Sequence, residues 1–301
     1  FELVSGDADC GVDLGEVERD RHGQVFRQSL LGFDHVLLDL GDAGGPLLGF
    51  ESGQPVVADC GSGEIEQGMV EIDATQLIHP LRLANDLETA RLNMVAQQIR
   101  PWEVIDERVL HVYDAVPRVR FVGDDYRGLA YADIAVPLGE GEQMMRPIQE
   151  ARMLQALGVQ HGNSVLEIGT GSGFVTACLA QLGGTVTSYE IHPALSEAAA
   201  RRLDDLGVEN VELVAGDGLH ASLAPGSFDV IAVTGSLPNF PSFLEDLLAL
   251  GGRMFLIVGE APAMTAKLVS RNAGGEVWRE DLFETVVPAL HNAPQAEHFV
   301  F

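Results

Sequence analysis

Three glycines that alternate with small polar residues mark the stretch of this sequence best suited to hold a ligand. In SVLEIGTGSGF, residues 164–174, a hydrophobic run ends in Glu167 and is followed by Gly169, Gly171 and Gly173. A turn without side chains lets a ligand approach the backbone closely. The spacing differs from the dinucleotide fingerprint G-x-G-x-x-G, because Phe174 stands where the third glycine would be. The sequence also has no G-x-x-x-x-G-K-[ST] loop for ATP or GTP.

Three acidic residues indicate which ligand this turn would hold. Glu167 would repel a phosphate and suits a cation such as a sulfonium. Glu190 can accept both hydrogen bonds of a ribose diol, and Asp217 can accept from an adenine amino group. Because ligands of open α/β sheets bind at the carboxyl ends of the strands, the set predicts S-adenosyl-L-methionine. The predicted cofactor-binding residues are Glu167, Gly169, Thr170, Gly171, Gly173, Glu190, Ile191, Asp217 and Gly218.

Alternating strands and helices are expected to position the glycine turn. We expect strands over 164–169, 185–191, 211–217, 228–235 and 252–259, and helices over about 173–182, 194–207 and 241–250. This alternation predicts an α/β fold with a doubly wound, mostly parallel, Rossmann-like sheet covered on both faces. Three helices are expected earlier in the chain: 87–99 before Pro101, 106–116 before Pro117, and 148–159 with Gly158 as its C-cap. The first two belong to an N-terminal helical cap.

Residues 1–84 differ from the rest of the chain. They carry 16 acidic and 4 basic residues, frequent glycine and poor periodicity. We interpret them as a disordered acidic arm or a non-native extension, and a small added domain is the alternative. The stretch 35–45 also shows a strand, an acid and glycines, but Pro46 and further glycines exclude a following helix. We therefore place the ligand-binding domain in residues 85–301.

Charge and cysteine content limit the partners and the compartment. The chain has 45 acidic residues against 18 Lys and Arg, with a formal net charge of −27, which argues against a nucleic-acid partner. Apolar stretches such as 254–258 are too short to span a membrane. Cys10, Cys60 and Cys178 lack metal-ligand spacing, and an odd count fits reduced thiols. We expect a cytoplasmic monomer with no metal site and no membrane contact.

From about Leu87 to Phe283 the sequence resembles the protein-L-isoaspartate O-methyltransferases. The resemblance lies in MVAQQIR, DERVLHVYDAVPRVRFV, YRGLAYADIAVPLGEG, VLEIGTGSGF, NVELVAGDG, FDVIAVTGSLP and LGGRMFLIVGE. The glycine motif is common to many methyltransferases, whereas the DERVL…VPR…FV…Y…LAY pattern is much more specific to this family. The resemblance implies S-adenosylmethionine-dependent methylation of isoaspartyl carboxylates in damaged proteins, with a protein or peptide substrate.

This chemistry needs no catalytic base. A carboxylate is already ionised at neutral pH and is its own nucleophile, so the site has to remove water and aim it. The missing Ser/His or His/Asp arrangement therefore does not argue against catalysis. We divide the domain into a helical cap with the acceptor loop, residues 85–147, and a cofactor-binding core, residues 148–301.

One segment departs from the family pattern. The family usually shows Gln-Thr-Ile-Ser-Gln-Pro after PLGEG, and this chain has Glu-Gln-Met-Met-Arg-Pro at 142–147. Gln143 stands at the threonine position and Met145 at the serine position, so an amide and a thioether replace two hydroxyl donors. Arg146 is a candidate for binding an anionic acceptor through two hydrogen bonds. The alternative is that it pairs with Glu142 or Glu150 at the surface.

The end of the strand 228–235 completes the predicted acceptor side. At this point adenine or cytosine amino methyltransferases show Asn/Asp-Pro-Pro-Tyr/Phe, whereas this chain has Thr234-Gly235-Ser236-Leu237-Pro238. The difference further disfavours a nucleic-acid substrate. Thr234 and Ser236 either line the acceptor pocket or end the strand. The catalytic candidates are Met145, Arg146 and Thr234, with residues 139–147 and a Thr234–Pro238 loop facing the acceptor.

Two other functions stay open. The Met144-Met145 pair favours a methyltransferase for a different acceptor. A cofactor-binding protein that has lost turnover is the other alternative.

Overall fold

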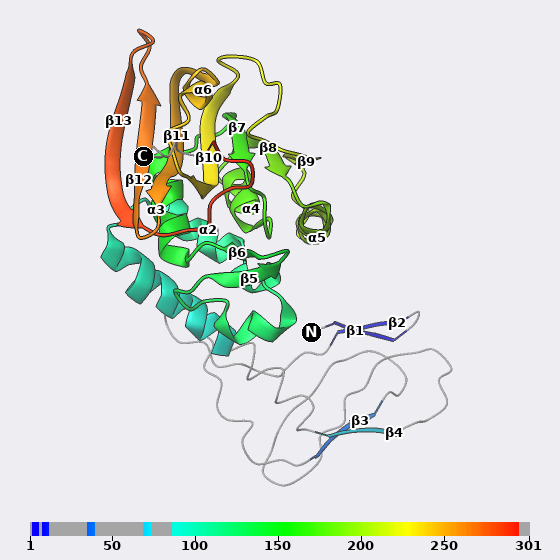
Figure 1. The fold of residues 1–301 in the computed structure, drawn as a ribbon. Coiled ribbons are helices and arrows are strands. Elements are labelled where there is room, and N and C mark those ends of the chain that lie inside the picture. Colours follow the sequence, from blue (N-terminus) through cyan, green and yellow to red (C-terminus); the bar gives the residue numbers. More distant parts are fainter. Residues whose placement is uncertain (1, 6–7, 12–34, 40–68, 74–85, 295–301) are drawn as a thin grey trace. The chain divides into compact units, whose positions relative to one another are not determined.

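A seven-stranded sheet organises the C-terminal two-thirds of the chain in the computed structural model (Figure 1). The structure describes residues 2–5, 8–11, 35–39, 69–73 and 86–294. The strand order is β13-β12-β11-β10-β7-β8-β9. The parallel strands are β7 (Ser164–Ile168), β8 (Thr185–Glu190), β9 (Val211–Ala215), β10 (Phe228–Leu237) and β11 (Leu248–Glu260). This confirms the predicted doubly wound, mostly parallel sheet.

The order of the parallel strands reverses between β7 and β10. From β7 the chain moves to β8 and β9 on one side, and β10 and β11 then pair on the other side of β7. Such a reversal leaves a crevice outside the carboxyl ends of the strands, where open α/β sheets bind ligands. The turn after β7 lies at this point.

Two antiparallel strands extend the sheet beyond β11. These are β12 (Ala263–Arg271) and β13 (Val277–Thr285). The helix predicted over 241–250 is much shorter than expected, because α6 spans only Ser242–Glu245. Leu248 is fully buried and already pairs with Phe228, so the second half of the apolar run belongs to β11.

The remaining helices follow the sequence pattern closely. They are α2 (Glu107–Ala115), α3 (Pro147–Leu157), α4 (Phe174–Gln181) and α5 (Pro193–Asp204). Asp106 caps α2 by accepting a hydrogen bond from the Arg108 N–H, and Gly158 ends α3 in the left-handed conformation. Before α2, residues 86–93 are α-helical and continue through η1 (Met94–Ile99) and η2 (Arg100–Trp102). Pro101 therefore lies inside the last tight turn rather than after it.

A short hairpin interrupts the helical cap. After η3 (Arg118–Arg120) and η4 (Asp124–Leu129), strand β5 (Val136–Gly139) pairs antiparallel with β6 (Glu142–Met144). The segment expected to be an acceptor loop is thus largely a hairpin, and its turn carries positive φ angles at Gly139, Glu140 and Gly141.

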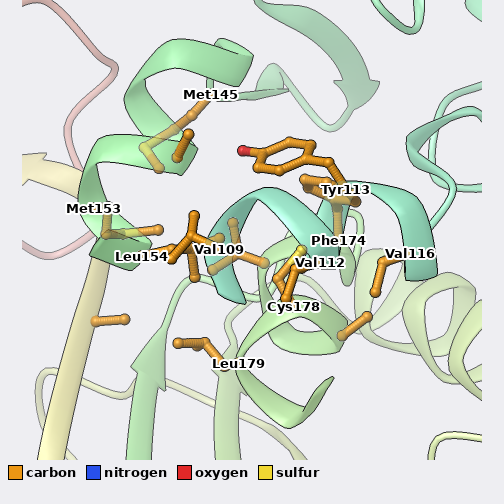
Figure 2. Packing of buried hydrophobic residues seen from close by; sticks show 14 of the residues in the cluster. Val109, Val112, Tyr113, Val116, Met145, Met153, Leu154, Phe174, Cys178 and Leu179 are labelled. Atoms are coloured by element: carbon orange, nitrogen blue, oxygen red, sulfur yellow. The ribbon is translucent and has the colours of Figure 1, made fainter. Parts of the chain in front are cut away.

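Side chains of the sheet alternate between two apolar layers. Val165 on β7 and Val230 on β10 contribute to the larger cluster, whereas Leu166 and Ile231 contribute to the smaller one. The larger cluster also contains residues of α2, α3 and α4, which meet as Figure 2 shows. Phe174 of α4 lies at its centre, with ring centroids 5.8 Å from Tyr113 and 5.5 Å from Phe121. These contacts pack the start of α4 against the cap.

The chain divides into two units, Phe1–Asp86 and Leu87–Phe301. In the first unit, β1 (Glu2–Ser5) pairs with β2 (Ala8–Gly11), and β3 (His35–Asp39) pairs with β4 (Met69–Asp73), both antiparallel. The glycines at 41–45 lie outside the described residues, and the interpretation of residues 1–84 stays a prediction. Within the described ranges, no helix has the length and apolar character needed to cross a bilayer.

Candidate active site

Backbone hydrogen bonds join the turn after β7 to the neighbouring strand β8. The N–H groups of Gly169 and Thr170 both donate to the carbonyl oxygen of Tyr189, at 2.9 and 3.1 Å. Gly169 has a φ of 103°, and a Cβ there would lie 2.3 Å from Oγ1 of Thr234. A side chain is therefore excluded at Gly169, and the turn presents backbone to the space beyond the strands.

Glu190, the last residue of β8, holds the tip of the turn. Its Oε2 accepts a 2.7 Å hydrogen bond from the N–H of Gly171, and its Oε1 accepts a 3.0 Å bond from the N–H of His192. The residue is buried but lines the cavity described below. Since a carboxylate has about four lone-pair sites, both oxygens can still accept from a ligand hydroxyl.

Asp217, just after β9, is fixed in the same way. Its Oδ1 accepts from the N–H of Leu219 at 3.0 Å, and its Oδ2 accepts from Nδ2 of Asn292 at 2.9 Å. Nδ1 of His220 also lies 2.9 Å from Oδ2. Burial raises the pKa of Asp217, but the hydrogen bonds from Asn292 and His220 outweigh it and lower the pKa below its usual value. Asp217 is therefore ionised at neutral pH.

An open cavity of about 900 Å³ lies at the carboxyl ends of β7, β8, β9 and β10. The structure brings most of the predicted residues to it. Those that line it are Gly169, Gly171, Glu190, Ile191, Asp217 and Gly218 from the predicted cofactor set, and Met145, Arg146 and Thr234 from the predicted acceptor set.

Three predicted cofactor residues lie elsewhere. Thr170 lines a smaller adjoining cavity of about 330 Å³, which Met145 also lines. Gly173 lines neither cavity; a Cβ there would lie 3.1 Å from Cβ of Ala199, so this glycine lets the start of α4 pack against α5. Glu167 also lines neither cavity.

Glu167 is instead an internal hydrogen-bond acceptor behind the turn. It is fully buried, and its Oε2 accepts from Oγ1 of Thr176 at 2.5 Å and from Oγ of Ser188 at 2.6 Å. Burial raises the pKa of this carboxyl to about 7, although the two hydroxyl donors oppose the shift. The expectation that Glu167 faces a cationic ligand directly is therefore not met by this geometry. Its position links β7, β8 and α4.

A buried ion pair supports the acceptor side of the cavity. Nη1 of Arg118 lies 2.9 Å from both carboxylate oxygens of Glu150, and both side chains are almost fully buried. Nη2 of Arg118 donates to the carbonyl oxygen of Met145 at 2.9 Å. The Arg118–Glu150 pair thus fixes the backbone between β6 and α3, where the family's serine position falls.

Arg146 does not pair with either of the two glutamates that were considered as its partner. Nη1 of Arg146 lies 3.4 Å from Oδ2 of Asp133 rather than beside Glu142 or Glu150. Glu150 is paired with Arg118 inside the protein. About half of the Arg146 side chain remains exposed, so it is accessible to an acceptor.

The predicted Thr234–Pro238 loop is wrong, because β10 continues to Leu237. Oγ1 of Thr234 lies 2.9 Å from the carbonyl oxygen of Ile168 and 2.6 Å from that of Gly169, so its hydroxyl serves the glycine turn. Ser236 is fully buried and donates to the carbonyl oxygen of Val287. Thr234 lines the cavity, but Ser236 does not.

The segment after β13 is a part of the site that was not predicted from the sequence. Residues 286–291 line the cavity because they pair with β10. The N–H of Ser236 donates to Pro288, and the N–H of Leu290 donates back to Ser236. No sequence pattern marks this segment. His192 was also missed, although its place two residues after Glu190 is a signal that was available.

The fold and the cavity define a Rossmann-like methyltransferase. The strand order of the sheet reverses at β7, and the glycine turn after β7 lines one cavity with Glu190 at the end of β8 and Asp217 after β9. The family model "Protein-L-isoaspartate(D-aspartate) O-methyltransferase (PCMT)" matches residues 90–292, and the chain belongs to this family.

Individual relatives agree with this assignment. A protein-L-isoaspartate O-methyltransferase of Anaeromyxobacter dehalogenans is 43% identical over 192 residues, covering 63% of this chain and 92% of the relative. One from Gloeobacter violaceus is 38% identical over 208 residues, covering 68% of this chain and 100% of the relative.

Two solved structures show the same fold. A putative protein-L-isoaspartate O-methyltransferase from Plasmodium falciparum, solved with S-adenosyl-L-homocysteine, has a TM-score of 0.57 and 20% identity over 65% of this chain and 96% of its own. A second structure, a protein-L-isoaspartate O-methyltransferase, has a TM-score of 0.58 and 25% identity over 68% of this chain and 66% of its own.

Proposed function

We propose that this chain transfers a methyl group from S-adenosyl-L-methionine to the free carboxylate of an isoaspartyl residue in a protein or peptide. The observation that carries the proposal is one cavity that joins the Gly169–Gly171 turn, Glu190 and Asp217 to the acceptor-side residues Met145 and Arg146. A monomeric state and a cytoplasmic location, both predicted from the sequence, are part of the proposal.

The residues of the cavity fit an adenosyl sulfonium. The turn at Gly169 excludes side chains, so the amino-acid part of the cofactor can approach the backbone. Glu190 is held by two backbone N–H groups and has lone pairs left for ribose hydroxyls, while the ionised Asp217 lies one strand further along. When bound, the cofactor supplies an electrophilic methyl group.

The acceptor side provides binding and orientation rather than proton transfer. Among the described residues that line the main cavity, Arg146 is the only Arg or Lys, so it supplies the fixed positive charge for an anionic acceptor. The carboxylate needs no base, because it is ionised before it binds. Met145 and Leu138 add apolar surface that removes water from the acceptor.

A second candidate is a methyltransferase of the same family with a different acceptor. The adjoining cavity is lined by Leu138, Met144 and Met145, and the hydroxyl of Thr234 is committed to the glycine turn. This side therefore offers fewer hydroxyl donors to a carboxylate than the family pattern implies.

A labelling experiment separates the candidates. The full chain is incubated with methyl-labelled S-adenosylmethionine and either an isoaspartyl peptide or the same peptide with ordinary aspartate. The proposal predicts base-labile methyl ester on the isoaspartyl peptide alone. Label that appears only when a cell extract replaces the peptides supports the different acceptor, and cofactor binding without any label supports a protein that has lost turnover.

A further inference from the structure

Three metal-ligating side chains that the proposed methyl transfer does not use meet at one wall of the cavity. Glu142 comes from β6, His192 precedes α5, and His291 belongs to the segment after β13. Nε2 of His291 lies 2.9 Å from Oε1 of Glu142, and Nε2 of His192 lies 3.8 Å from the same oxygen. One ligand atom from each residue lies within 4.8 Å of the other two.

The cluster is incompletely satisfied by hydrogen bonds within the protein. Nε2 of His192 is buried and has no hydrogen-bond partner among the described residues. Its 3.8 Å separation from Glu142 is too long for a hydrogen bond. Leaving a buried polar atom unpaired costs free energy. A ligand that accepts the lone pair of this nitrogen would remove the cost.

The spacing of the donor atoms suits one tetrahedral ion. Zinc with bonds of roughly 2.0–2.2 Å holds its ligand atoms about 3.4 Å apart. The two separations from Oε1 of Glu142, 2.9 and 3.8 Å, each differ from that by about 0.5 Å and in opposite directions. The ligand atoms of the two histidines lie within 4.8 Å of each other. Side-chain rotations that bring all three separations to about 3.4 Å would place the three atoms in coordination.

We propose that Glu142, His192 and His291 bind one zinc-class divalent ion, with a fourth position open to the cavity. Two imidazoles and one carboxylate are a donor set that zinc accepts, whereas magnesium and calcium prefer oxygen ligands alone. In the metal-free protein the Nε2 proton of His291 can serve the bond to Glu142, and the ion replaces that proton. The proposal goes beyond the methyl transfer proposed above and does not depend on which acceptor is methylated.

The ion would join parts of the chain that are distant in sequence. The β5–β6 hairpin, the start of α5 and the segment after β13 each provide one ligand, and all three line the cavity. Bound metal therefore stabilises this wall of the cavity by connecting three segments.

The test is calorimetric titration of the full chain with zinc chloride after treatment with a chelator and its removal. We expect binding at one site that is lowered at least about tenfold in each of His192→Ala, His291→Ala and Glu142→Gln, since loss of even an outer partner costs 10–100-fold in metal affinity. His111→Ala, which removes an exposed histidine on α2, should bind zinc like the wild type. Magnesium chloride should give no binding at this site.

Thermal unfolding provides the second measurement. Zinc should raise the melting temperature of the wild type and of His111→Ala, and have less effect on the three ligand variants. A cooperative melting transition of each variant in chelator shows that the variant is folded. If a histidine variant does not fold, Glu142→Gln, which keeps the side-chain shape, provides the test. Absence of zinc binding by the wild type, or zinc binding by the three ligand variants as tight as that of the wild type, would overturn the proposal.

Discussion

The backbone N–H of Gly171 donates a 2.7 Å hydrogen bond to the carboxylate of Glu190, which links the glycine turn of β7 to the end of β8. The shape of the turn and the direction of the Glu190 carboxylate are therefore set together. Because Glu190 also accepts from the N–H of His192, its position is fixed before a ligand arrives. Such preorganisation lowers the entropic cost of binding.

Gly169→Ala should weaken cofactor binding and destabilise the fold by roughly 1–3 kcal/mol, because the new Cβ would overlap Thr234 in a turn with positive φ. Gly139→Ala is the matched control: its φ of 98° is similar, but a Cβ there meets nothing within 4 Å. Urea unfolding and cofactor titration measure both effects. Equal losses in the two variants would mean that backbone strain, and not crowding against Thr234, explains the glycine.

Arg118→Met should lower the free energy of unfolding by about 3–5 kcal/mol, because it leaves the buried Glu150 without its partner. It also removes the hydrogen bond to the Met145 carbonyl. The double variant Arg118→Met/Glu150→Gln should be less destabilised than Arg118→Met alone, since no uncompensated charge remains. Urea unfolding at constant pH compares the two variants. A double variant that is less stable than Arg118→Met would contradict the prediction.

Glu167→Gln should change how stability depends on pH. The folded-state pKa of Glu167, about 7, lies above the ordinary 4.5, so the folded protein binds this proton more tightly than the unfolded chain. The resulting stabilisation is fully present below pH 4.5 and is lost as the pH rises through about 7. The stability of Glu167→Gln relative to wild type should therefore grow between about pH 5 and pH 8, by up to about 3 kcal/mol.

Denaturant unfolding at several pH values measures this difference. Burial also raises the pKa of Glu150, but that residue titrates in both proteins and cancels in the comparison. A constant difference across the range would show that Glu167 is ionised throughout.

Arg146→Met should raise the KM for an isoaspartyl peptide about tenfold or more and leave the affinity for the cofactor nearly unchanged. A charge-assisted contact to a carboxylate contributes about 1.5–3 kcal/mol, and the acceptor is the anion that Arg146 would hold. Arg120→Met, which removes an exposed arginine outside the cavity, is the control. Steady-state kinetics at saturating cofactor measures the KM of each variant. A KM of Arg146→Met equal to that of the wild type would show that Arg146 does not hold the acceptor.

Much of the sheet could be predicted because its signals are local. β7 and most of β10 are apolar runs, β8 ends in Glu190, and the helices α4 and α5 follow β7 and β8. The β12–β13 pair had no comparable signal, since most of β13 is exposed and lacks an apolar alternation. The run around Leu248 was assigned to a helix because a short apolar segment fits a helix and a buried strand equally well.

The cavity was largely predictable because Gly169, Glu190 and Asp217 lie at the carboxyl ends of three neighbouring parallel strands. Glu167 was misplaced because side chains alternate between the two faces of the sheet along β7. Val165 packs in the cluster that contains α4, so Glu167, two residues further on, points to the same face and meets Thr176. The segment 286–291 depends on long-range pairing with β10, which no local pattern reports.

Titration of the full chain with S-adenosylmethionine tests the central claim most directly. The wild type should bind at one site, and Glu190→Gln should bind at least about tenfold more weakly, a loss of about 1.4 kcal/mol. Glu212→Gln, an exposed glutamate on the neighbouring β9, should bind like the wild type. If the wild type does not bind, or if Glu190→Gln binds as tightly as Glu212→Gln, the cavity beside Gly171 is not the cofactor site.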